Sequence, residues 1–157
     1  MTAPIPIASG MRLTPARLNL PAWTPYTPTW TAQTTNPVLS NGTLIGRHRY
    51  LDAETVQVRI VLRPGSTTTY GSGQYRFALP VPAVAGGPDP LLQATCLMGG
   101  ALYRLVGWAN AATAAQSFVS MYRDNATTEQ LSAWNNTAPI AFANGHSFGM
   151  SGIYYVA

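Results

Sequence analysis

Alternation of apolar and polar side chains is the feature that most constrains the fold of this chain. In the segment 55–62, Val56, Val58, Ile60 and Leu62 occupy every second position. A period of two is the signature of a half-buried β-strand. No stretch keeps the period of 3.6 residues that an amphipathic helix requires. The sequence therefore predicts an all-β chain.

Short segments of this kind recur between residues typical of turns. The predicted strands are 41–50, 55–62, 74–81, 93–98, 101–109, 117–123, 139–143 and 147–156. Pro80 and Pro82 are expected to end the third of them, and Gly99-Gly100 predicts a hairpin. Helix is possible only over Ala-rich 109–115, where a loop is favoured, and in one turn around 129–133. About eight strands fit an antiparallel β-sandwich or jelly roll.

The first 36 residues have a different character and predict an extended arm. Six prolines prevent a long helix; they are Pro4, Pro6, Pro15, Pro21, Pro25 and Pro28. Thr14 and Pro15 predict a single short helical segment over 14–20. Three aromatic residues in the arm need a partner surface, either on their own domain or on another subunit; they are Trp23, Tyr26 and Trp30. The predicted organisation is an anchoring arm over 1–36 and a β-sandwich domain over 37–157.

Charge is scarce and one-sided. Charged residues make up 9% of the chain, against about 25% in an ordinary soluble domain. The net charge is +4, and every basic residue is arginine. A weakly charged surface is buried against another protein with little desolvation cost. The arginines are spread along the sequence without a run, and we therefore expect no nucleic-acid binding.

The chemistry-bearing residues do not form a recognisable active site. Cys96 lies in an apolar run, as expected of a buried, inert thiol. His48 and His146 are far apart, and no His, Cys, Asp or Glu spacing suits a metal. Asp52 and Glu54 are expected to set a hairpin turn and not to form a glycosidase pair. The sequence predicts no enzyme, no metal and no cofactor.

The amino-terminal residues lack the basic and apolar stretches of a secretory signal. The longest apolar region, 91–115, is interrupted by glycines, Arg104 and Asn110. We therefore expect synthesis in a cytosol and no membrane insertion.

Surface aromatic residues are the candidates for ligand or partner contact. Trp134 lies in a polar segment and is followed by Asn135 and Asn136, whose amides suit sugar hydroxyls. Trp108 is a second candidate for the same contact. The alternative is that Trp134 belongs to a loop packed onto the end of the sandwich.

Several short motifs follow one another in order between Trp23 and Pro80. They are Trp30-Thr31, Thr35-Asn36-Pro37, Asn41-Gly42-Thr43, Gly46-Arg47, Tyr50, the Val56-Val58-Ile60 alternation, Gly65-Ser66-Thr67-Thr68 and Gly71 to Val81. In this order they resemble a domain of small tail and fibre-like structural proteins of tailed bacteriophages, especially those of actinobacteria. The segment 13–19 is similar to the segment that often precedes that domain, and 149–157 resembles the family's final strand, whereas 83–137 is not covered.

The resemblance implies a virion structural role, a β-sandwich that tends to trimerise, and no catalytic residues. We therefore expect a homotrimer that is anchored to other virion proteins through its arm. The expected function is that of a tail-tip or fibre-type protein with a face for host-surface glycan binding or for assembly. A capsid or tail decoration protein is the alternative, and a polysaccharide-degrading enzyme is the third hypothesis.

Overall fold

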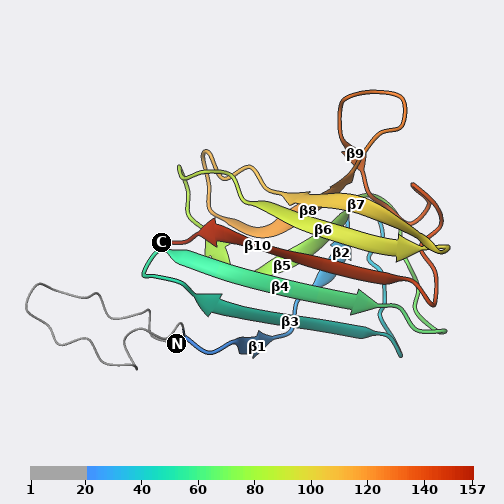
Figure 1. The fold of residues 1–157 in the computed structure, drawn as a ribbon, viewed down its shortest axis with the longest axis horizontal. Helices are drawn as coiled ribbons and strands as arrows, with labels where there is room; N and C mark the ends of the chain where they lie inside the picture. Colours follow the sequence, from blue (N-terminus) through green and yellow to red (C-terminus); the bar gives the residue numbers. More distant parts are fainter. Residues whose placement is uncertain (1–20) are drawn as a thin grey trace, which may run out of the picture.

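The computed structural model describes residues 21–157, and these residues contain β-strands but no helix (Figure 1). The strands are β1 (Thr24–Tyr26), β2 (Trp30–Ala32), β3 (Thr43–Tyr50), β4 (Thr55–Arg63), β5 (Tyr75–Ala83), β6 (Leu91–Met98), β7 (Ala101–Trp108), β8 (Gln116–Arg123), β9 (Ser132–Ala133) and β10 (Ser147–Tyr155). The helical segment expected over 14–20 lies outside the described residues. No described helix has the length and apolarity that a membrane crossing requires.

The strands form one antiparallel sheet, as the alternation predicted. Its order is β1-β3-β4-β10-β6-β7-β8-β5-β2, with β9 paired to β8. β1 and β2 are consecutive in the chain yet form the two opposite edges of the sheet. Residues 27–29 alone connect them, so the sheet must curl into a half-barrel that brings its edges together (Figure 1). We call this junction the seam.

Aromatic stacking across the inside of the curl holds its two halves together. Phe77 on β5 stacks on Phe148 of β10, with ring centroids 4.8 Å apart. Trp30 on β2, the cross-strand partner of Phe77, has its ring parallel to that of Phe77 with the centroids 6.5 Å apart. Burying each such side chain contributes about 1.5–3 kcal/mol, and every long strand adds alternate residues to this core. The two facing halves are therefore packed like the layers of a sandwich.

The observed elements differ from the prediction in four places. β5 continues through Pro80 and Pro82 to Ala83. Proline is tolerated there because the pairing of β5 with β8 is irregular between Ala78 and Ala83 and does not require a backbone N–H donor from the prolines. The segment 139–143 is not a strand, and 129–133 forms no helical turn, its last two residues being β9. β1 and β2 lie inside the segment predicted as an arm, and both pair with the sheet.

The polar loop after β4 uses its hydroxyl groups internally. Asn41 Nδ2 donates to Ser66 Oγ at 3.0 Å, and Asn41 Oδ1 accepts from the Thr67 amide at 3.0 Å. Buried Thr68 donates its hydroxyl to the Leu39 carbonyl at 2.6 Å. The loop is thereby locked to the turn before β3.

Candidate binding face

The surface that we call the outer face is formed by five neighbouring strands, β3, β4, β10, β6 and β7. Its residues are those that alternate with the buried core positions of these strands and therefore point away from the core. They are Thr43, Ile45, Arg47 and Arg49; Thr55, Gln57, Arg59, Val61 and Arg63; Ser147, Gly149, Ser151, Ile153 and Tyr155; Leu91, Gln93, Thr95 and Leu97; and Leu102, Arg104, Val106 and Trp108.

Large hydrophobic side chains gather on the outer face. Of the nine exposed large hydrophobic residues in the described part of the chain, only Val38 and Leu131 lie elsewhere. The most exposed are Leu102, at 70%, and Leu91, at 63%. Single exposed leucines need no explanation, whereas a gathering of this kind on one face marks an interaction surface.

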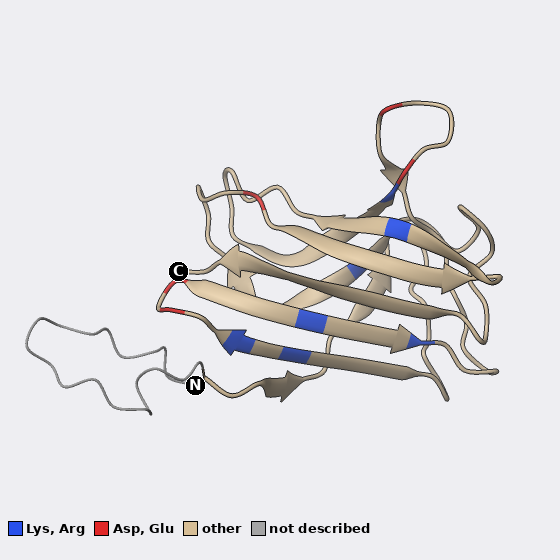
Figure 2. Cartoon of the chain, in the orientation of Figure 1, with Lys and Arg blue, Asp and Glu red and all other residues tan. Residues whose placement is uncertain are grey.

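Four arginines occupy the β3–β4 side of the outer face. They are Arg47, Arg49, Arg59 and Arg63 (Figure 2). Arg47 lies directly opposite Arg59 in the register of the two strands, an arrangement that destabilises the sheet by charge repulsion. The only ion pair among residues 21–157 is on β7, between Arg104 and Asp124 at 3.1 Å. The arginines are spread along the sequence, but the pairing of β3 with β4 brings four of them together on one side of the outer face.

Two of these arginines enclose an aromatic ring. The guanidinium carbons of Arg49 and Arg59 lie 4.7 Å and 4.5 Å from the ring centroid of Trp23. Arg49 Nε also donates to Gln57 Oε1 at 2.8 Å. Cation–π contacts of this kind fix the chain entering β1 against the outer face.

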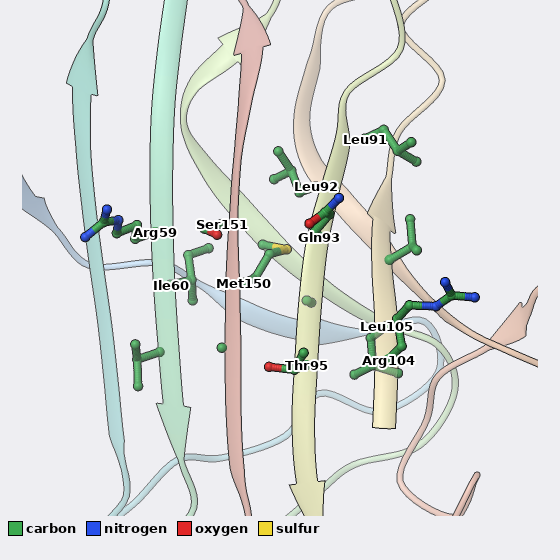
Figure 3. A pocket seen from close by; sticks show the side chains of 14 residues that line it. Arg59, Ile60, Leu91, Leu92, Gln93, Thr95, Arg104, Leu105, Met150 and Ser151 are labelled. Carbon is green, nitrogen blue, oxygen red and sulfur yellow. The ribbon is translucent and has the colours of Figure 1, made fainter. Parts of the chain in front are cut away.

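A shallow hollow of about 680 Å³ lies in the middle of the outer face. It exists because β10, the central strand, presents Ser147, Gly149 and Ser151 where its neighbours present longer side chains. Figure 3 places Arg59 and Arg104 on opposite sides of the hollow, with Gln93 and Thr95 between them. A Cβ atom built on Gly149 meets nothing within 4 Å, so the hollow is open space and not a packing defect.

The titratable groups nearest the core do not face this hollow. Burial raises the pKa of the Cys96 thiol to about 12, which keeps it protonated and poorly nucleophilic. Burial lowers the pKa of His48, whose ring packs at the inner side of β3 against Tyr26 and Tyr50. Among residues 21–157, no three His, Cys, Asp or Glu side chains are grouped as metal ligands would be. The outer face thus offers shape, apolar surface and positive charge.

Trp134 does not belong to this face. Its side chain is completely buried, stacked on Phe148 at 5.1 Å and edge-on to Tyr75 at 4.9 Å. This corrects the expectation that its indole contacts a ligand, and it agrees with the alternative of a loop packed onto the sheet. Buried Phe142 covers the same ring at 5.3 Å, because the segment after β9 folds back over the mouth of the curl.

The neighbouring amides have local roles. Asn135 Oδ1 accepts hydrogen bonds from the amides of Thr137 and Ala138 at 3.0 and 2.9 Å, so it shapes its own turn. The Asn136 carbonyl accepts from the Phe142 amide at 3.0 Å. Trp108 lies apart from them, at the β7 margin of the outer face, where its Nε1 donates to Asp89 at 3.2 Å. The structure therefore does not bring the predicted contact residues together.

The three aromatic residues expected to anchor the arm all contact their own domain. Trp30 is buried in the core, and Tyr26 is part-buried on β1 with its hydroxyl 3.4 Å from the Ala78 carbonyl. Trp23 rests on the outer-face arginines. The sequence left open whether these aromatic residues pack on their own domain or on another subunit. In the structure they pack on the chain's own sheet.

No family model, curated protein or solved structure matches this chain.

Proposed function

We propose that this chain is a structural protein of a bacteriophage particle and that its outer face is covered by another protein of that particle. Support for the particle comes from the ordered motifs between Trp23 and Pro80, which resemble tail and fibre-like proteins. The same resemblance supports a homotrimer of the tail-tip or fibre type, with a decoration protein of the capsid or tail as the alternative. The proposal assigns the chain no reaction.

The aliphatic side chains that gather on the outer face support the proposal that another protein covers this face. Binding of sugar rings uses exposed aromatic faces, but only Tyr155 among the seven strongly exposed hydrophobic residues is aromatic. Arginine together with buried apolar side chains is typical of the centre of a protein–protein interface. The geometry therefore favours a protein partner over a host glycan.

Electron cryo-microscopy of purified particles, combined with labelling by an antibody against this chain, tests the proposal. The expected result is label on the particle and a density map in which another protein covers the outer face. The proposal fails if purified particles lack the chain, or if the outer face is open to solvent while other surfaces make the contacts.

A further inference from the structure

The hollow is part of a groove that follows the central strand of the outer face. The small side chains of β10 run from Ser147 to Ser151, a length of roughly 13 Å. Longer side chains of β4 and β6 form the walls, which are about 9.5 Å apart because each lies one strand spacing from β10. An α-helix with its side chains is about 10–12 Å across, and 13 Å corresponds to about two and a half of its turns. Because this width exceeds the gap between the walls, the helix would lie above the groove and insert only the side chains of its ridge into it.

Unpaired positive charge lies on one side of the groove, because Arg104, the arginine on the other side, is paired with Asp124. The four arginines of β3 and β4 lie on one side. Exposed Leu97 and Leu102 lie on the other, on β6 and β7, and exposed Ile153 closes one end of the groove. A helix seated between them therefore needs acidic residues along one flank and apolar residues along its ridge and other flank.

A second copy of the chain is a poor occupant of the outer face. Joining two such faces buries the arginines of both copies, and the outer-face residues include no Asp or Glu to pair with them, which costs free energy in a buried interface. The amino-terminal segment 1–20 is equally unsuitable, since its only charged residues are Arg12 and Arg17. Charge complementarity thus indicates an acidic partner.

We infer that the groove over β10 binds an acidic amphipathic helix of another particle protein, with a large apolar side chain inserted above Gly149. The inference rests on the proposed function, because it takes the outer face to be a docking surface. It adds the chemistry of the partner: leucine-like residues on the ridge and glutamate or aspartate beside Arg47, Arg59 and Arg63.

Fluorescence anisotropy with three designed helical peptides tests this inference on the full chain at physiological ionic strength. The first peptide carries a leucine ridge flanked on one side by glutamates, the second has lysines for the glutamates, and the third has serines for the leucines. The first peptide should bind at least about tenfold more tightly than the other two, a difference of about 1.4 kcal/mol.

Three variants locate the binding site. Gly149→Val should weaken the first peptide about tenfold or more and leave the melting temperature at or above that of the wild type, because the added side chain fills open space. Ser117→Val, at an exposed position of β8, is the matched control and should change neither quantity. Arg47→Glu should weaken the glutamate peptide and strengthen the lysine peptide, since it reverses the charge that selects the partner.

Five results would overturn the inference. Equal binding of the serine and leucine peptides would mean that charge alone attracts them, and unchanged affinity of Gly149→Val would place the contact elsewhere. Binding of duplex DNA more tightly than the peptide, with loss in Arg47→Glu, would indicate nucleic acid. Self-association abolished by Gly149→Val would indicate a second copy. If no peptide binds but particles show the outer face covered by protein, the proposed function stands and the helical partner is wrong.

Discussion

Replacing Gly46 with alanine should loosen the seam at which the sheet closes on itself. Gly46 is buried on β3 directly opposite Tyr26 of β1. A Cβ atom at this position would lie 2.6 Å from Pro28 Cγ and closer still to the Tyr26 ring. The Tyr26 ring does not yield easily, because β1 is paired to β3 and the Tyr26 hydroxyl reaches across to Ala78. The segment 27–29 must therefore move.

The size of the effect follows from two opposing contributions. Forcing one extra carbon into a packed site costs about 1–3 kcal/mol. Replacing glycine with alanine also raises the free energy of unfolding by about 0.4–1 kcal/mol, because it reduces the conformational freedom of the unfolded chain. The net loss for Gly46→Ala is then about 0–2.6 kcal/mol in the free energy of unfolding. For a chain of this size each kcal/mol corresponds to about 2–4 °C in melting temperature.

Urea denaturation and calorimetry of the wild type and four variants measure the effect. Gly149→Ala is the matched control, because the same exchange there meets no atom and should raise stability by about 0.4–1 kcal/mol. In a double-mutant cycle, Tyr26→Ala should reduce the cost of Gly46→Ala by removing the ring that is struck. A gain in stability in Gly46→Ala equal to that of Gly149→Ala, or a coupling of zero with Tyr26, would refute this account of the seam.

Three further predictions concern the core. Trp134→Ala should lower the free energy of unfolding by about 3–5 kcal/mol in urea titrations, as for other buried aromatic residues; a change near zero would show an exposed side chain. The Cys96 thiol, whose pKa is raised to about 12 by burial, should resist a thiol reagent at mildly alkaline pH until urea unfolds the chain. Because burial lowers the pKa of His48 in the folded state, the unfolded chain takes up its proton first. Stability should therefore be complete above the ordinary histidine pKa of 6.5 and decrease as the pH falls below it, and His48→Phe should remove that dependence in pH-resolved melting curves.

Seven of the eight predicted strands are found within a few residues of their expected ends, whereas 139–143 is not a strand. β4 and β6 illustrate the reason: each buries every second residue, and that pattern is a property of the segment itself. β1 and β2 escaped prediction because they are three residues long and rich in proline and aromatic residues. Their assignment depends on edges supplied by β3 and β5, which no local pattern reveals.

Trp134 shows why the environment of an aromatic residue is hard to predict from its neighbours in sequence. The residues around it are polar, yet they are polar because they form turns, as Asn135 does with its side-chain oxygen. The indole itself points into the curl and stacks on Phe148 of a strand that follows only after residue 146. The polarity of a loop therefore predicts that its backbone forms a turn, but it does not predict the direction in which one of its side chains points.

The outer face divides into a part that the sequence could have revealed and a part that it could not. Once Asp52 and Glu54 are placed in the turn of a hairpin, Tyr50 pairs with Val56, and counting outward along both strands brings Arg47 opposite Arg59. The arginine side was therefore accessible from one correct turn assignment, because a hairpin's register follows from its loop. The groove depends instead on β10 inserting between β4 and β6, pairings that connect Gly149 to Val61 and Thr95 across long stretches of chain. Only the folded sheet could place a glycine between those side chains, and so only the structure could show where a partner's side chain would fit.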